Sequence, residues 1–209
     1  MSFNYVIHCD LAAANCLIVG GGRVALRKVQ TLLETGAQVT VVAPDFLSDL
    51  AGIQHEQLHC IKRPFVMDDL ANRDLVFVAT NDRGLNEEIA AACRDRHIPV
   101  NVADSRLESS FIVPALLQKE DLLISIATNG KNPGYSRALK AYLNDQIDDS
   151  FLEALDIWCA VRDRVKEEVQ GQTEREKLLR QLSLADLIKA MEAGSKEDVY
   201  RRVIECLLL

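Results

Sequence analysis

The apolar positions of this chain form short continuous runs separated by longer segments with helical periodicity. Runs typical of strands buried on both faces of a parallel sheet cover residues 16–19, 39–42 and 75–79. Between the first two runs, apolar side chains recur at helical spacing until Gly36, a residue that commonly ends a helix. A helix over 86–96 and a strand over 99–103 continue the alternation. This pattern predicts an α/β fold with a doubly wound, Rossmann-type parallel sheet.

Weaker patterns predict the remaining elements. Strands are expected over residues 5–8, 58–63, 111–114 and 122–127, and short helices over 48–52 and from 68 onwards. The pattern changes after Gly134: a helix is predicted over 136–147, and everything from 151 onwards is helical and highly charged. We therefore expect the sheet to end near Ala103 and a helical region to complete the chain.

The first apolar run is followed by a glycine turn. Gly20, Gly22 and Ala25 have the spacing of the G-x-G-x-x-A fingerprint, and a strand, a helix and a second strand surround it. In such a turn the first glycine permits a tight bend, the second lets backbone N–H groups approach a pyrophosphate, and the small third residue brings helix and strand together. The helix N-terminus favours the negative charge. The motif predicts dinucleotide binding, although a glycine turn alone is also common in proteins without a nucleotide.

Composition narrows the class of protein. The chain has 209 residues, a net charge of −7 and 48% hydrophobic residues, which suits a globular protein and disfavours nonspecific nucleic-acid binding. No apolar run is long enough to span a membrane, and the N-terminus lacks the features of a signal peptide, so we expect a cytoplasmic protein. Six cysteines without a C-x-x-C pair indicate reduced thiols. Four histidines without zinc spacing give no reason to expect a metal site.

Residues at the predicted strand ends provide candidate cofactor ligands. The second strand ends at Ala43, Pro44 and Asp45, so no acidic residue stands at the usual ribose-binding position. Asp45 lies slightly beyond it, and no arginine follows immediately to bind the extra phosphate of NADP, which favours NAD. Thr80 and Asn81 follow the 75–79 strand, and we expect them to face the cofactor.

Asp104 is the candidate acid–base residue. It stands just past the predicted strand 99–103, at the edge of the sheet where ligands bind in open α/β folds. A carboxylate there can take up a proton during a substrate oxidation. The alternative is a turn or helix-capping aspartate, which is equally consistent with its position.

The motifs together resemble one family. The chain is similar to precorrin-2 dehydrogenase, the NAD-dependent part of siroheme synthase, some members of which are also sirohydrochlorin ferrochelatases. The resemblance covers about the first two-thirds of the chain, in order, and is carried by residues 19–28, 33–37, 39–44, 79–82, 101–104, 110–115 and 125–133, with Asn86.

This resemblance implies oxidation of precorrin-2 to sirohydrochlorin, with NAD as cofactor, by a homodimer. It implies an NAD-binding domain over residues 1–110, a small α+β dimerisation segment over 111–149 and a helical C-terminal domain over 150–209. By the same resemblance Asp104 is the catalytic residue. Arg23, Val24, Pro44 and Asp45 match positions that contact NAD.

The resemblance also places substrate contacts in the loop after residue 127. Thr128 stands where some relatives have a serine in the tetrapyrrole cleft. The loop departs from the family's small residues, with Asn129 and Asn132 present instead. This departure puts substrate binding, and especially iron insertion with Fe²⁺ as a second substrate, in doubt. Basic residues that suit the eight substrate carboxylates are Arg27, Lys28, Lys131, Arg137 and Lys140; Arg27 and Lys28 are equally well explained as solvated helix residues.

Two other functions stay open at this point. The first is a nucleotide-sensing regulatory module of a potassium-uptake system, which would also use a glycine-rich βαβ unit but would leave Asp104 and the loop at Thr128 without a role. The second is a dehydrogenase of small substrates, although no Tyr-x-x-x-Lys or His–Asp catalytic set is recognisable.

Overall fold

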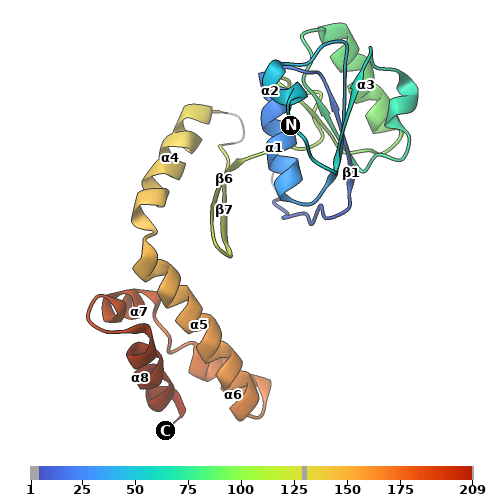
Figure 1. The fold of residues 1–209 in the computed structure, drawn as a ribbon. Coiled ribbons are helices and arrows are strands. Elements are labelled where there is room, and N and C mark those ends of the chain that lie inside the picture. The colour runs from blue at the N-terminus through green and yellow to red at the C-terminus, as the bar shows by residue number, and fades with distance from the viewer. Residues whose placement is uncertain (1–4, 129–130, 209) are drawn as a thin grey trace. The chain divides into compact units, whose positions relative to one another are not determined.

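The computed structural model describes residues 5–128 and 131–208. The chain divides into two compact units, Met1–Val113 and Pro114–Leu209 (Figure 1). The division into three domains over residues 1–110, 111–149 and 150–209, which the family resemblance implies, stays a prediction.

A parallel sheet forms the centre of the first unit. Its strands are β1 (Asn15–Val19), β2 (Gln38–Ala43), β3 (Leu58–Lys62), β4 (Leu75–Val78) and β5 (Val100–Val102). They lie in the order β3-β2-β1-β4-β5, and every neighbouring pair is parallel. The order reverses between β1 and β4, which creates the crevice where α/β sheets bind ligands. The predicted Rossmann-type α/β fold is confirmed.

Helices cover both faces of this sheet, so the strands are apolar on both sides (Figure 1). The helical elements of the first unit are α1 (Arg23–Glu34), α2 (Ser48–Ala51), the 3₁₀ helix η1 (Met67–Leu70) and α3 (Arg83–Asp95). Ile18 and Phe77 pack with Val29 of α1, whereas Val19 and Val78 pack with α3. Neighbouring residues of a strand therefore enter opposite cores, as the pleat requires.

The edge of β5 differs from the prediction. Residues 111–114 do not form a strand, and the chain before them covers this edge through hydroxyl groups. The N–H groups of Val100 and Val102 donate to the hydroxyls of Ser110 and Ser109, at 2.8 and 2.9 Å. The Phe111 ring then packs edge-on against Phe77, with 5.6 Å between centroids. The apolar run that resembled a strand therefore supplies core contacts instead of backbone pairing.

The predicted strand over 5–8 is also wrong. Tyr5, Val6 and Ile7 are 88%, 68% and 64% exposed and make no ladder with any strand of the described residues. A short apolar run is not sufficient for a strand, because a strand also needs a neighbouring edge that offers backbone partners.

The second unit begins with an antiparallel hairpin of β6 (Ala115–Lys119) and β7 (Leu122–Ile126). The strand at β7 was predicted, but 115–121 was interpreted as a connection, because the tight turn at Glu120, with φ of 49°, carries no glycine signal. Helix α4 (Pro133–Gln146) follows. The Lys119 ammonium donates to the carbonyls of Asn144, at 2.8 Å, and Ile147, which fastens the hairpin to the C-terminal end of this helix.

The rest of the second unit is helical, as predicted. It consists of α5 (Asp149–Glu168), α6 (Gln172–Leu179), α7 (Leu184–Met191) and α8 (Lys196–Leu208). Ile157, Val161 and Val165 of α5 are buried against Leu187 of α7 and Val199 of α8. This core is separate from those around the parallel sheet.

Candidate functional site

The glycine turn connects the end of β1 to the start of α1. Gly20 has a φ of +120°, and a Cβ there would lie 2.3 Å from the carbonyl oxygen of Ala79, which follows β4. Its N–H donates to the carbonyl of Val42 at 2.9 Å. Only glycine fits this conformation and this contact, which agrees with the predicted tight bend.

Gly21 has a role that the sequence pattern did not reveal. A Cβ at this position would lie 2.1 Å from the carbonyl oxygen of Asp45. The carbonyl of Gly21 also accepts the N–H of Leu47 at 2.8 Å. The glycine turn is therefore packed directly against the loop after β2. A run of three glycines was the available signal, but its reason lies in a contact across 24 residues of sequence.

Gly22 is the position where the turn opens to solvent. It is the N-cap residue of α1, with φ −89° and ψ −167°, and no side chain caps the helix. A Cβ added to it would meet no atom within 4 Å. The N–H groups of the first helical turn are thus left for an external acceptor, beside the exposed Arg23 and the half-buried Val24. These features fit the pyrophosphate of a dinucleotide.

Residues at the other strand ends line the same edge of the sheet. Asp45 follows β2, and its carboxylate lies 3.2 Å from the ammonium of Lys62, the last residue of β3. Pro44 is exposed beside it. No motif in the sequence marks Lys62, because its contact with Asp45 depends on the pairing of β2 with β3, in which Ala43 lies opposite Lys62.

Thr80 and Asn81 follow β4, between the glycine turn and β5. The Thr80 hydroxyl lies 2.5 Å from the side-chain oxygen of the buried Asn86, whose amide donates to the Thr80 carbonyl at 3.1 Å. Asp82 caps α3 by accepting the N–H of Leu85. The Thr80 side chain therefore fixes the shape of this loop, and the exposed Asn81 is the one turned to solvent.

Asp104 lies two residues beyond β5 in a turn closed by a bridge between Val102 and Ser105. Its side chain is exposed, and its φ of 62° is left-handed, a conformation that aspartate tolerates better than most residues. The buried Ser109 hydroxyl donates to the Ser105 carbonyl at 2.7 Å and accepts the N–H of Val102. The left-handed turn that carries the Asp104 carboxylate is thus held in place by Ser109, and the catalytic role of Asp104 stays a prediction.

The predicted substrate residues belong to the second unit. Thr128 is half-buried, and its hydroxyl accepts the N–H of Asn132 at 3.1 Å. Asn132 in turn caps α4 by accepting the N–H of Tyr135, so one departure from the family pattern has a structural role. Lys131 and Arg137 are exposed. Asn129 and Gly130 lie outside the described residues, and the substrate-binding roles of Thr128, Lys131 and Arg137 stay predictions.

The remaining chemistry of the described chain is limited. No group of three or more His, Cys, Asp or Glu side chains there is arranged to hold a metal ion. Burial raises the pKa of the Cys16 and Cys93 thiols to about 11, so neither is a ready nucleophile. No helix within residues 5–128 and 131–208 has the length and apolar character needed to cross a membrane.

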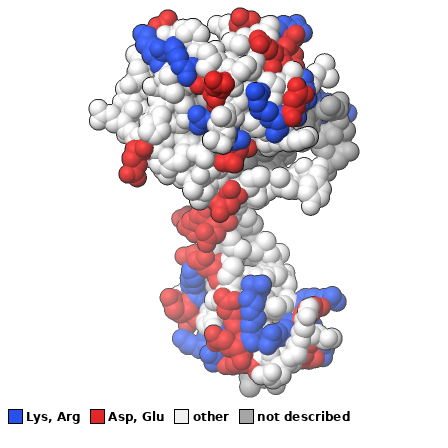
Figure 2. All heavy atoms as spheres, turned by 90° about the vertical axis from the view of Figure 1, so that its right-hand side faces the viewer, with Lys and Arg blue, Asp and Glu red and all other residues white. Residues whose placement is uncertain are grey.

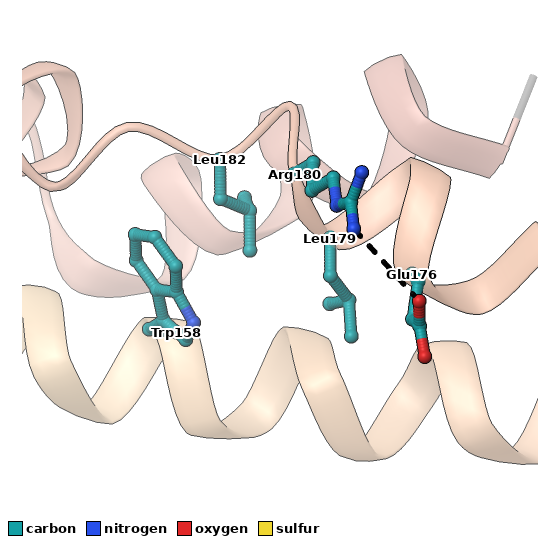
Figure 3. Close-up of a pocket in the computed structure, with 5 residues that line it drawn as sticks. All are labelled: Trp158, Glu176, Leu179, Arg180 and Leu182. Carbon is teal, nitrogen blue, oxygen red and sulfur yellow. Dashed lines mark ion pairs between the residues drawn. The ribbon is translucent and has the colours of Figure 1, made fainter. Parts of the chain in front are cut away.

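A hollow of about 380 Å³ lies in the helical part of the second unit. Figure 3 shows its lining, the apolar side chains of Trp158, Leu179 and Leu182 beside Glu176 and Arg180, which form an ion pair of 4.0 Å. None of the predicted site residues lines it. We interpret this hollow as a shallow packing gap between helices.

Charge is mixed on the face shown in Figure 2, where basic and acidic side chains are interspersed over the first unit. Beside the candidate ribose-binding residue Asp45, the positive charge comes from Lys62.

Comparison with known proteins agrees with this geometry. Residues 7–115 match a family described as "Putative NAD(P)-binding". Siroheme synthase of Nitrosospira multiformis is 32% identical over 91% of this chain, and that of Ectopseudomonas mendocina is 31% identical over 99%. The chain spans 42% and 44% of the length of these two relatives.

A solved structure, that of SirC, precorrin-2 dehydrogenase, has the same fold. It superposes with a TM-score of 0.72 at 23% identity, covering 97% of this chain and 100% of SirC. These relatives give no support to a potassium-uptake module. The chain belongs to the NAD(P)-binding family, is similar in sequence to siroheme synthases over most of its own length, as the sequence resemblance predicted, and shares the fold of SirC.

Proposed function

We propose that this chain oxidises precorrin-2 to sirohydrochlorin and transfers a hydride to NAD⁺. The observation that carries the proposal is the position of the exposed Asp104, in a left-handed turn just after β5. Strand β5 lies next to β4, and Asp104 is therefore at the same edge of the sheet as the open glycine turn. Similarity to siroheme synthases over nearly the whole chain supports precorrin-2 as the substrate.

NAD rather than NADP is the proposed cofactor. The pyrophosphate would accept N–H groups of the first turn of α1, and Asp45 would accept a hydroxyl of the adenosine ribose. A carboxylate at that position repels the additional phosphate of NADP. Pro44 and Asn81 are proposed to contact the cofactor from the neighbouring strand ends, with Thr80 holding the Asn81 loop through Asn86.

The oxidation removes a hydride and a proton from the tetrapyrrole. NAD⁺ supplies the hydride acceptor when bound, and the Asp104 carboxylate is proposed to take the proton. Ser109 is a positioning residue, because its hydroxyl holds the turn on which Asp104 stands. Because Asp104 is exposed, the approaching substrate would itself exclude water from the carboxylate.

Thr128, Lys131 and Arg137 are proposed to bind the substrate. Lys131 and Arg137 are exposed and carry charges opposite to those of the substrate carboxylates. Thr128 lies at the base of the same loop, where its bond to Asn132 fixes the start of α4. Replacing Lys131 and Arg137 together should raise the KM for precorrin-2 while leaving NAD⁺ affinity unchanged.

We also propose a homodimer that pairs through residues 111–149. Helix α4 supports this assignment, because Tyr135 and Tyr142 lie on it seven residues apart and are 58% and 61% exposed. Large aromatic side chains at helical spacing are typical of protein interfaces. Sedimentation of the purified chain should give the mass of a dimer, and Tyr135→Lys with Tyr142→Lys should give that of a monomer.

Two further properties belong to the same proposal. Iron insertion into sirohydrochlorin is proposed as a second activity by analogy with bifunctional family members, with Fe²⁺ as a substrate; it predicts faster insertion than in a protein-free control. A cytoplasmic location is proposed because the six cysteines are unpaired thiols, as expected in a reducing compartment.

The Asp104→Asn variant tests the catalytic assignment. Asparagine also tolerates a left-handed φ, so the turn is expected to persist. Turnover of precorrin-2 should fall at least about a hundredfold, a loss within the usual range for a general base, while NAD⁺ affinity stays unchanged. A variant that folds, binds NAD⁺ and turns over at the wild-type rate would remove Asp104 from the mechanism.

A further inference from the structure

Lys62 has a defined place beside the candidate ribose site. It is the last residue of β3 and lies opposite Ala43, the last residue of β2, in the parallel register. Its ammonium lies 3.2 Å from the Asp45 carboxylate, and the two side chains are 69% and 86% exposed. An ion pair this exposed contributes little to stability, and a ligand that binds either partner can displace it.

The contacts of Gly21 place this pair within the dinucleotide site. A Cβ on Gly21 would lie 2.1 Å from the Asp45 carbonyl oxygen and 3.1 Å from the Ala43 Cβ, so the phosphate turn and the loop after β2 touch. In a βαβ dinucleotide site the loop after the second strand meets the adenosine ribose. Lys62 and Asp45 thus lie together where the 2′ substituent of that ribose is expected.

We propose that Asp45 and Lys62 together determine whether the chain binds NAD or NADP, which differ in the 2′ substituent of the adenosine ribose. Asp45 selects the hydroxyl of NAD, which donates to its carboxylate, and it repels the 2′-phosphate of NADP. Lys62 pairs with the carboxylate in the free chain and can instead pair with a 2′-phosphate when that carboxylate is removed. The preference for NAD therefore rests on one carboxylate, and its removal exposes a cation suited to NADP.

Other nearby charges do not provide the same anchor. Arg63, the next residue, is engaged with Asp69 through two hydrogen bonds of 2.6 and 2.8 Å. Arg23 begins α1 beside the expected pyrophosphate, which both cofactors share, so it cannot distinguish them. Asp49, in the first turn of α2, is an exposed carboxylate four residues beyond Asp45 and provides a matched control.

The test is calorimetric titration of NAD⁺ and NADP⁺ into the full chain and four variants: Asp45→Asn, Asp45→Asn with Lys62→Met, Asp45→Asn with Lys62→Arg, and Asp49→Asn. Asp45→Asn should increase NADP⁺ affinity about tenfold and weaken NAD⁺ binding, because one repulsion is removed and one charge-assisted bond is lost. Adding Lys62→Met should abolish the gain, whereas Lys62→Arg should keep it. Asp49→Asn should leave the ratio of affinities unchanged.

The inference rests on the cofactor part of the proposed function and not on precorrin-2, because these titrations contain no tetrapyrrole. Equal NADP⁺ affinity in Asp45→Asn and in its Lys62→Met double variant would overturn the role of Lys62. Unchanged NADP⁺ affinity in Asp45→Asn would overturn the whole proposal. If the chain shows these shifts but does not oxidise precorrin-2, the role of Asp45 and Lys62 in cofactor selection is supported and the proposed substrate is refuted.

Discussion

Replacing Gly22 with alanine separates cofactor binding from folding. The backbone of Gly22, with φ −89° and ψ −167°, is accessible to alanine, and the added methyl would meet no protein atom within 4 Å. The neighbouring glycines are different, because a Cβ would lie 2.3 Å from a carbonyl oxygen at Gly20 and 2.1 Å at Gly21. The methyl of Gly22→Ala therefore projects into the space assigned to the pyrophosphate, and the fold is kept.

The expected magnitudes follow from this geometry. Alanine is a poorer N-cap than glycine, so the substitution should lower the free energy of unfolding by roughly 0.5–1 kcal/mol. A pyrophosphate pushed away from the helix loses at least one charge-assisted hydrogen bond, worth about 1.5–3 kcal/mol. The Kd for NAD⁺ should therefore rise about tenfold to a hundredfold.

The assay is calorimetric titration of NAD⁺, with urea unfolding of the same samples. Gly52→Ala is the matched control: Gly52 follows α2 with φ −82°, and its added methyl would lie 3.4 Å from the Ser48 carbonyl oxygen. This control should keep the wild-type Kd. Wild-type NAD⁺ affinity in Gly22→Ala would refute the placement of the pyrophosphate at this turn.

Three further predictions concern stability. Ser109→Ala should lower the free energy of unfolding by about 1–3 kcal/mol in urea, because the buried N–H of Val102 loses its acceptor; an unchanged midpoint would contradict this. The hydrogen bonds from Arg63 lower the pKa of the Asp69 carboxyl in the folded chain. Asp69 therefore adds to the free energy of unfolding at pH values above its unfolded pKa of about 4, and this stabilisation is lost as the pH falls through the folded pKa. Asp69→Asn should accordingly be less stable than wild type at neutral pH and lose that difference in acid; a constant difference would argue against it. Burial lowers the pKa of Lys28 to about 8, below its value in the unfolded chain. Between about pH 8 and 10 the unfolded chain binds more protons than the folded chain, so the free energy of unfolding should rise with pH over this range. Lys28→Met should remove this rise.

The sequence was sufficient for the architecture of the first unit because its signals are local. Continuous apolar runs predicted the buried strands, and the glycine spacing predicted the bend at Gly20 and the open N-terminus at Gly22. Helix α3 begins at Arg83, three residues before the prediction, because Asp82 was not recognised as its cap.

The errors and omissions arise where the outcome depends on residues distant in sequence. Residues 111–114 have the apolar composition of a strand, but the edge of β5 is already satisfied by Ser109 and Ser110. The need for Gly21 and the approach of Lys62 to Asp45 both follow from the pairing of β1, β2 and β3. No motif within a single segment contains that information.

The central claim is tested most directly by incubating the purified chain with precorrin-2 and NAD⁺ and following both products by absorbance. The account predicts that NADH and sirohydrochlorin appear together, in equal amounts, and that neither appears when NAD⁺ is omitted. A folded chain that binds NAD⁺ but forms neither product would contradict it.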